Sequence, residues 1–232
     1  MGQRSQIYIR FPHKKYLIAR YFQWNYGDRM ISRARGIAEK ILSYKEYDRY
    51  WDWSDNELHR QIEAKKFRRI CDVNFDFRDI TLSINICKQF FEMENDWKDF
   101  NVFTFEGQDN NDGQLFIDVQ SDGSIKYCLT DSSYKFGPFN ALEYLLWDDD
   151  SDEFKLVREE ARSININSEK KIKEIFEMVN LHMDEETFEY TISNLQFLQD
   201  NENISLMTRE EMLEFINYPY SKKLIKEEAK WE

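Results

Sequence analysis

Carboxylate side chains near the middle of the chain are the first candidates for chemistry. Asp72, Asp76 and Asp79 lie close together, with Arg78 among them. Converging carboxylates can hold a divalent metal ion or share a proton, as a metal-dependent nuclease or hydrolase requires. The two-residue period of a strand would place Asp72 and Asp76 on one face and Asp79 on the other. Asp72, Asp76 and the more distant Asp118 are therefore the candidates for an enzyme acting on nucleic acid or a nucleotide.

Other catalytic and metal-binding motifs are absent from the sequence. The 3 histidines are isolated and lack the H-x-x-x-H or H-E-x-x-H spacing that binds zinc. With only 7 glycines, the chain contains no G-x-S-x-G, G-x-G-x-x-G or P-loop pattern. The Asn- and Asp-rich stretch before Gly113 fails as a calcium loop, because Gln108 and Val119 would stand where carboxylates are needed. We therefore expect no cofactor, and a binding protein is favoured over an enzyme.

The net charge of −12 is divided unevenly along the chain. Residues 1–70 hold 16 Lys or Arg and 8 Asp or Glu, a net charge of +8, whereas residues 71–232 hold 16 and 36, a net charge of −20. Such asymmetry bears on partners and on association rates, not on the fold. Two interpretations stay open: the two parts neutralise each other within one globule, or they face different partners.

Basic residues near aromatic ones form a candidate nucleic-acid surface in the first 70 residues. Groups of this kind bind single strands by pairing with phosphates and stacking on bases. The candidates are Arg29, Arg33, Arg35, Lys65, Lys66, Arg68 and Arg69. Against this interpretation, a net charge of −12 repels nucleic acid from most of the surface. Direct nucleic-acid binding is kept as an alternative function.

The acidic part of the chain supplies a second candidate surface. Its densest run contributes Asp148, Asp149, Asp150 and Asp152 as candidate binding residues. A strongly acidic chain can occupy a basic groove that evolved for nucleic acid, and charge complementarity would speed that encounter and make it salt-sensitive. Solubility alone also explains such a charge. The expected partner is a host protein or a ribonucleoprotein complex, and the sequence does not determine the oligomeric state.

The elements that must position these residues indicate an α+β fold. Residues 6–24 alternate in two runs about a polar turn and predict an N-terminal β-hairpin. Apolar residues then recur every three or four positions over residues 29–44, which predicts an amphipathic helix, and a capping box at Ser54 opens another helix to about Ile70. Two Asp-Gly pairs between apolar runs lead us to interpret residues 102–130 as a central three-stranded antiparallel meander.

Helical signals dominate the C-terminal third of the chain. Ser168 and Asp184 are expected to begin helices, and Thr208 with Glu211 forms a capping box at the start of a third. Strand signals vanish beyond the acidic run. We therefore expect an α+β domain over residues 1–150 and a helical subdomain or extension over residues 151–232.

Membrane and export signals are not seen. No window approaches 18 apolar residues, and the chain opens into a strand-like run rather than an apolar signal segment. Cys71, Cys87 and Cys128 are widely spaced, with no C-x-x-C pair, and indicate no disulfide framework. These features lead us to expect a soluble cytoplasmic protein without a membrane partner.

Three segments carry a resemblance to known proteins. Gly2–Arg10, Leu17–Met30 and Asn110–Val119 resemble uncharacterised phage and prophage proteins of low-GC Gram-positive bacteria. The resemblance covers about the first 150 residues and carries no catalytic assignment. Acidic phage proteins of this size include inhibitors of bacterial defence complexes, among them anti-CRISPR proteins. The resemblance thus implies a non-catalytic phage-derived binding protein that inhibits a host nucleic-acid-handling or defence complex.

Overall fold

A six-stranded mixed sheet forms the centre of the protein, with strand order β3-β2-β1-β4-β5-β6. The structure, a computed structural model, describes residues 4–12, 17–23, 25–45, 82–85, 101–102, 112–133, 136–147, 152–164 and 166–220. The strands are β1 (Arg4–Arg10), β2 (Leu17–Gln23), β3 (Leu82–Asn85), β4 (Gln114–Val119), β5 (Ile125–Thr130) and β6 (Ile204–Leu206). The predicted α+β class is confirmed.

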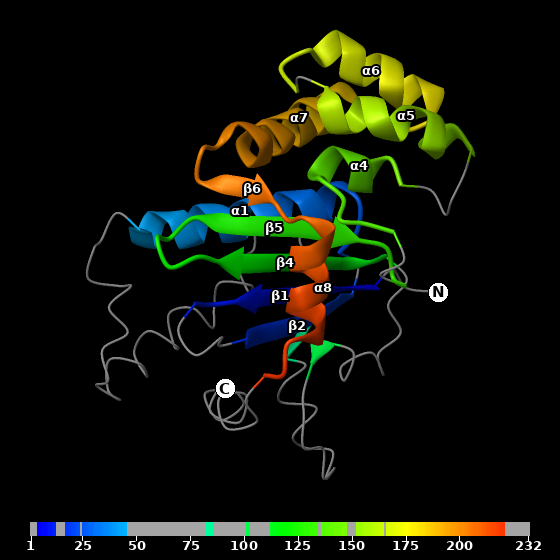
Figure 1. Ribbon diagram of the computed structural model, residues 1–232. Helices are drawn as coiled ribbons and strands as arrows, with labels where there is room; N and C mark the ends of the chain where they lie inside the picture. The colour runs from blue at the N-terminus through cyan, green and yellow to red at the C-terminus, as the bar shows by residue number, and fades with distance from the viewer. Residues whose placement is uncertain are drawn as a thin grey trace.

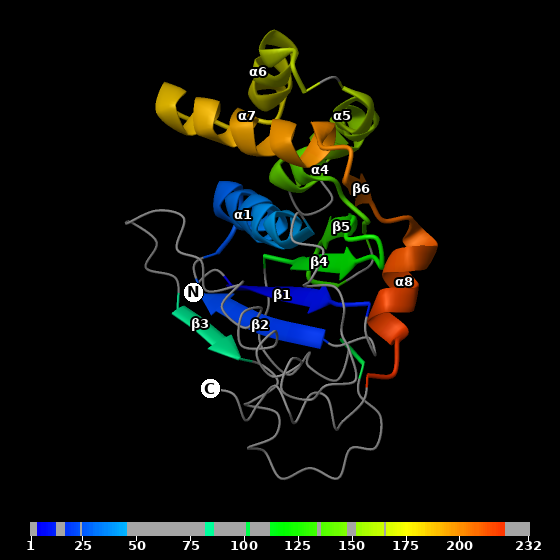
Figure 2. The ribbon, with the colours of Figure 1, turned by 90° about the vertical axis from the view of Figure 1, so that its left-hand side faces the viewer.

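Helices lie against both faces of this sheet. They are α1 (Asp28–Lys45), α4 (Ala141–Leu145), α5 (Asp152–Ser163), α6 (Glu169–Met178), α7 (Glu185–Asp200) and α8 (Arg209–Asn217). Seen along the sheet, α1 covers one face and α8 the other, while α4 to α7 stack beyond α1 and the β6 edge (Figure 2). We call α5, α6 and α7 the helical unit; it lies at one end of the molecule (Figure 1).

Both hairpins that the sequence predicts at the ends of β1 and β4 are present. β1 and β2 pair antiparallel, with Ile9 opposite Ile18. β4 and β5 also pair antiparallel across a tight turn, where the Gln120 carbonyl accepts from the Gly123 N–H at 3.0 Å. Gly123 has a φ of +80°, a conformation that glycine adopts at little cost. The antiparallel strand pairing predicted within residues 6–24 is therefore confirmed, whereas residues 13–16 and 24 are outside the described residues. The β4–β5 half of the meander is also confirmed.

The structure corrects the remainder of the meander predicted over residues 102–130. The prediction paired residues 102–105 with β4. In the structure β1 occupies that position and runs parallel to β4, with Arg10 opposite Asp118. Val102 lies in a 3-10 turn, and residues 103–105 are outside the described residues. Local patterning predicts strands but not the pairing of strands that are a hundred residues apart, which side-chain packing decides.

The first Asp-Gly pair starts β4 instead of closing a hairpin. The backbone N–H of Asp112 donates to the Arg4 carbonyl at 2.9 Å, and the Asp112 carboxylate accepts from the Arg4 N–H. Gly113 has a φ of +86°, and a Cβ atom there would lie 2.0 Å from the carbonyl oxygen of Thr130. Only glycine lets the chain pass this close to β5.

A short strand corrects the expectation that the C-terminal third is purely helical. β6 pairs parallel with β5, with Ile204 opposite Ile125. Three residues are too few for alternation to predict a strand. The predicted helix starts are confirmed: Ser168 is the N-cap of α6, Asp184 accepts from the Thr187 N–H at 2.7 Å, and Thr208 and Glu211 form the reciprocal capping box of α8.

Two apolar layers follow from the alternation of side chains along the strands. Ile7 and Ile9 of β1 join a core that extends through α1 and α4 into the helical unit, as far as Leu195 and Ile204. Tyr8 of β1 points the other way, into a smaller cluster beneath α8. The larger core contains residues from both sides of the boundary expected at residue 150. The division into an α+β domain over residues 1–150 and a helical subdomain or extension over residues 151–232 stays a prediction.

No helix in the described ranges combines the length and the apolar composition that crossing a bilayer requires.

Candidate functional site

Many of the sequence-predicted site residues are outside the described residues. These are Lys65, Lys66, Arg68, Arg69, Asp72, Asp76, Asp148, Asp149 and Asp150. The helix predicted from Ser54 to Ile70 also lies there. Asp152 is the first residue of α5. The predictions that can be located in full are the three arginines of α1 and Asp118 of β4.

Two of the three arginines on α1 make contacts inside the protein. Arg33 is buried, and its Nε donates to Asn25 Oδ1 at 3.0 Å. Arg35 reaches across to α7, where its Nη1 donates to Ser193 Oγ at 2.8 Å. Arg29 is exposed at the start of the helix. The guanidinium groups of Arg33 and Arg35 therefore hold α1 to its neighbours, and the structure does not bring the three arginines together as one cationic surface.

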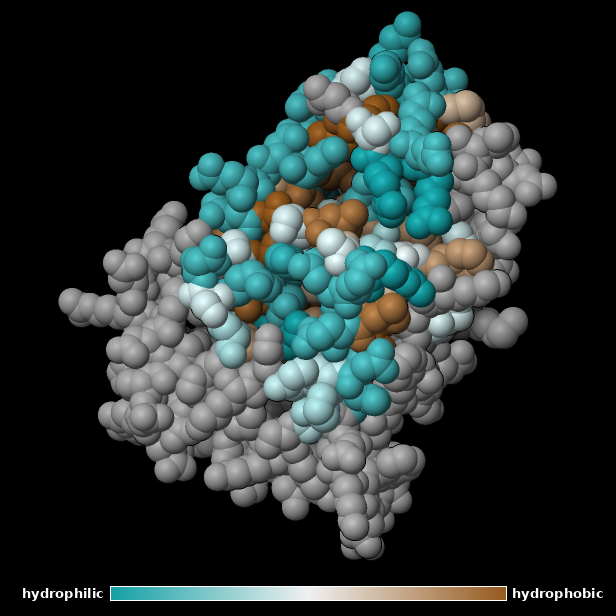
Figure 3. Space-filling model, in the orientation of Figure 1, coloured by the Kyte–Doolittle hydropathy of each residue, from teal (hydrophilic) through white to brown (hydrophobic). Residues whose placement is uncertain are grey.

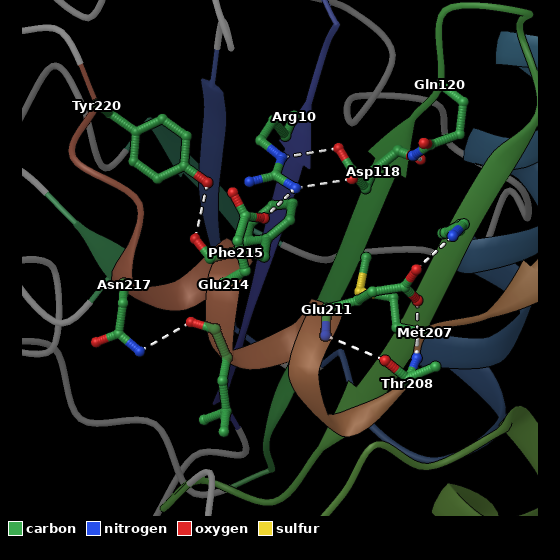
Figure 4. Close-up of polar contacts among 12 residues, drawn as sticks. Arg10, Asp118, Gln120, Met207, Thr208, Glu211, Glu214, Phe215, Asn217 and Tyr220 are labelled. Carbon is green, nitrogen blue, oxygen red and sulfur yellow. Dashed lines mark hydrogen bonds and ion pairs between the residues drawn. The ribbon is translucent and has the colours of Figure 1, made fainter.

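Asp118 belongs to a buried ion-pair network between the sheet and α8 (Figure 4). Its two carboxylate oxygens accept from Nε and Nη2 of Arg10, both at 2.8 Å. The same Nη2 lies 2.7 Å from Glu214 of α8, and the guanidinium stacks over the Phe215 ring at 4.6 Å. We call Arg10, Asp118 and Glu214 the Arg10 centre.

The Arg10 guanidinium is buried and bonded to two carboxylates, although Glu214 is 52 % exposed and Nη1 of Arg10 has no hydrogen-bond partner among the described residues. Burial alone would lower the pKa of Arg10, but the hydrogen bonds to Asp118 and Glu214 outweigh it and hold that pKa above its usual range. Tyr220 covers one side; burial raises the pKa of its phenol, which donates to the Phe215 carbonyl at 2.9 Å. Both Asp118 oxygens are engaged by the guanidinium, so Asp118 holds Arg10 in the position where it contacts Glu214 of α8.

Exposed carboxylates gather instead on the helical unit. Residues 152–200 hold 12 Asp or Glu and 6 Lys or Arg, a net charge of −6. In the space-filling view the surface over the helical unit is largely hydrophilic (Figure 3). Within the ranges that the structure describes, no three His, Cys, Asp or Glu side chains converge as a metal site would require.

A hollow between α5 and α6 combines these carboxylates with exposed apolar surface. It has a volume of about 530 Å³ and is lined by Glu160, Lys171, Glu174, Ile175, Glu177 and Met178. Met178 is 50 % exposed, although it is a large apolar side chain. Glu174, Glu177 and Met178 share one helix face because they are three and four residues apart. We call this site the α6 hollow.

A second hollow adjoins it on the other side of α6. Its volume is about 250 Å³, and Phe176, Met183 and Phe188 provide apolar walls. The Phe176 and Phe188 rings meet edge to face with centroids 5.7 Å apart. Glu177 lines both hollows. The two hollows therefore meet at Glu177, in the last turn of α6.

The rim carboxylates of the α6 hollow are poorly neutralised. Glu174 lies 3.7 Å from Lys170, an exposed pair of the kind that contributes little stability. Among the described residues, Glu160 and Glu177 have no ion-pair partner. One basic residue, Lys171, lines the hollow against three glutamates. The α6 hollow thus keeps a net negative charge around an apolar centre.

Sequence reasoning selected the aspartate run at residues 148–152 and missed the α6 hollow. Of the Arg10 centre it selected only Asp118, as a candidate catalytic residue. The helical period of α6 was a usable signal, since it places Glu174, Glu177 and Met178 together and leaves a methionine among carboxylates. Arg10 gave no such signal, because it occupies the polar phase of the alternation in its strand. Its partners Asp118 and Glu214 are distant in sequence and could not have been paired with it.

No protein-family model, curated protein or solved structure matches this chain. Function therefore has to be inferred from the chain's own side chains. The Arg10 centre is buried and paired, whereas the α6 hollow is open and carries unneutralised charge. The α6 hollow is the candidate functional site.

Proposed function

We propose that the chain is a binding protein that engages a basic surface of a partner macromolecule through the α6 hollow. One observation carries the proposal: a half-exposed methionine, Met178, lies in a hollow rimmed by glutamates, two of which have no ion-pair partner among the described residues. An apolar centre within a polar rim is the usual anatomy of a protein interface. Methionine suits such a centre because it is flexible and polarisable.

The charge of the rim specifies the chemistry of the partner. Glu160, Glu174 and Glu177 outnumber Lys171, so a lysine- or arginine-rich surface complements the hollow. An apolar side chain between those cations would contact Met178 and Ile175. Attraction between the two surfaces speeds association and weakens as salt is added.

The finer proposal concerns the identity of the partner. The resemblance to phage and prophage proteins supports a host nucleic-acid-handling or defence complex. Protein surfaces that bind nucleic acid are rich in lysine and arginine, which is the chemistry that the hollow complements. A chain bound there would compete with the nucleic acid and inhibit the complex. The acidic charge, which repels nucleic acid, fits a competitor better than a nucleic-acid binder.

Capture from a lysate of a low-GC Gram-positive bacterium tests this function. Three immobilised baits are compared: the wild-type chain, the hollow variant Glu160→Gln/Glu177→Gln/Met178→Ser, and the control Glu202→Gln/Glu210→Gln. The control removes the same charge at exposed positions outside the hollow. We expect one basic protein or ribonucleoprotein on the wild-type and control baits, released by salt and absent from the hollow variant. Equal recovery on all three baits would contradict the proposal.

A further inference from the structure

A second type of pocket lies between the helical unit and the edge of the sheet. We call it the α4–β6 pocket, because α4 and β6 form two of its walls while α7 and the end of α5 complete it. Its volume is about 230 Å³. In the space-filling view, hydrophobic side chains surround a hollow in this part of the surface (Figure 3).

The lining of this pocket differs from that of the acidic hollows. Its floor is aliphatic, formed by Leu142, Ile166, Leu195, Leu198 and Ile204. Its polar lining residues include Asn140, Arg162, Gln199 and Ser205. Among the described residues that line it none is acidic, although the chain as a whole has a net charge of −12.

Arg162 brings surplus positive charge to the pocket. Its Nε lies 3.0 Å from Oε1 of Glu143, a carboxylate that is fully buried. Arg158 Nε contacts the same oxygen at 3.3 Å. Two guanidinium groups therefore share one carboxylate, which neutralises only one of their two positive charges. Arg162 is 48 % exposed, so part of its guanidinium is accessible to a ligand.

Two hydrogen-bond donors at the pocket stay available. Arg162 uses Nε for Glu143 Oε1, and Nη2 for the Pro138 carbonyl at 2.9 Å and for Glu143 Oε2 at 3.3 Å, which leaves Nη1. Asn140 accepts from the Glu143 N–H through Oδ1 at 2.8 Å, which leaves its Nδ2 amide. Within the described residues neither Arg162 Nη1 nor Asn140 Nδ2 has a hydrogen-bond partner.

We propose that the α4–β6 pocket binds a small amphipathic anion, a monocarboxylate with a short aliphatic tail. The tail lies on the aliphatic floor, where burial of methylene groups provides affinity. The carboxylate accepts from Arg162 and Asn140, and the charge-assisted bond to the guanidinium selects an anion over a neutral molecule. The 230 Å³ volume restricts the ligand to a short chain. This site is separate from the α6 hollow and does not depend on it.

Titration calorimetry with three probes tests the chemistry of the site. Hexanoate has both the carboxylate charge and the aliphatic tail, 1-hexanol lacks the charge, and acetate lacks the tail. We expect saturable binding of hexanoate that is at least about tenfold tighter than binding of either control, because each control loses one of the two contributions. Equal affinity for hexanoate and 1-hexanol, or no saturable binding of hexanoate, would overturn the proposal.

Matched variants then test the residues. Arg162→Gln and Arg158→Gln each remove one partner of Glu143, but only Arg162 lines the pocket. Hexanoate affinity is expected to fall about tenfold in Arg162→Gln and to change little in Arg158→Gln. Ser205→Trp fills the pocket from an exposed position and should abolish binding, which keeps the test decisive if Arg162→Gln does not fold. Equal losses in the two arginine variants, or full binding in Ser205→Trp, would reject the assignment.

Discussion

The Arg10 centre and the α6 hollow both gather carboxylates from different elements, but only in the Arg10 centre does every carboxylate contact a guanidinium. Arg10 is 3 % exposed and is held by two carboxylates, whereas Met178 is 50 % exposed among carboxylates of which two lack an ion-pair partner in the described residues. Burial explains the pairing, because an unpaired charge removed from water is costly. An exposed charge keeps its hydration, so it can stay unpaired without that cost in free energy. The comparison indicates a role in folding for the first region, and it supports the proposal that the second region binds a partner.

Removal of Asp118 should produce the largest change in stability. In Asp118→Ala the buried Arg10 loses both bonds to that carboxylate and keeps only Glu214, which is 52 % exposed. Breaking a buried pair from one side typically costs about 3–5 kcal/mol. We expect a loss of about 3 kcal/mol in the free energy of unfolding, measured by urea denaturation.

The matched change at the exposed partner should be milder. Glu214→Gln leaves the two Asp118 bonds in place, and the expected loss is about 1 kcal/mol. A loss for Asp118→Ala that is no greater than that for Glu214→Gln would show that the Arg10 centre does not hold the fold in the way described.

Helix caps provide one comparable interaction in each region. Thr208 caps α8 next to the Arg10 centre, and Asp184 caps α7 in the helical unit. Replacement of either by Ala removes one cap bond and should cost about 1 kcal/mol. Because one apolar core joins the sheet to the helical unit, unfolding followed by circular dichroism and by tryptophan fluorescence should coincide in both variants. Two separate transitions in Asp184→Ala would instead favour independent folding of residues 151–232.

A smaller, pH-dependent effect is expected at Glu211 on the α8 side. The hydrogen bond from Lys126, together with the Thr208 N–H, holds the pKa of Glu211 below its usual value. Because the folded-state pKa lies below the unfolded one, the stabilisation is present above the unfolded pKa and is lost as pH falls through the folded pKa. The difference in unfolding free energy between wild type and Glu211→Gln should therefore shrink from about pH 7 to about pH 3. A constant difference would exclude this linkage.

Neutralising the α6 hollow should change stability least. Glu160 and Glu177 are exposed and unpaired among the described residues, so Glu160→Gln/Glu177→Gln should alter the unfolding free energy by no more than about 0.5 kcal/mol. Urea denaturation of the double variant measures this directly. A loss comparable to that of Asp118→Ala would mean that these glutamates are part of the fold, and it would remove the contrast between the two regions.

The sequence specified local structure well where side-chain period and caps decide it. The first hairpin, α1, the β4–β5 turn at Gly123 and the caps at Asp184 and Thr208 all follow from patterns of a few residues. Pairing between distant strands did not follow, since nothing local to Arg10 or Asp118 indicates that β1 and β4 lie side by side. β6 escaped detection because three residues show no period.

The candidate site was harder to predict than the fold. The density of acidic residues predicted a binding site at residues 148–152. The α6 hollow depends instead on how α5 and α6 pack, which leaves Met178 exposed. Arg33 and Arg35 illustrate the opposite error, because a basic residue in a sequence carries no sign of whether it faces solvent or a neighbouring helix. Exposure is a property of tertiary packing, and a pattern of residue types does not determine it.

The most direct test of the division between the two regions is the dissociation constant of the captured partner, measured by calorimetry for three proteins. These are the wild-type chain, the hollow variant Glu160→Gln/Glu177→Gln/Met178→Ser and the control Glu202→Gln/Glu210→Gln. We expect the hollow variant to bind at least about tenfold more weakly, and the control to stay within about twofold of wild type. An unchanged affinity in the hollow variant, or an equal loss in the control, would contradict the assignment of the α6 hollow to partner binding.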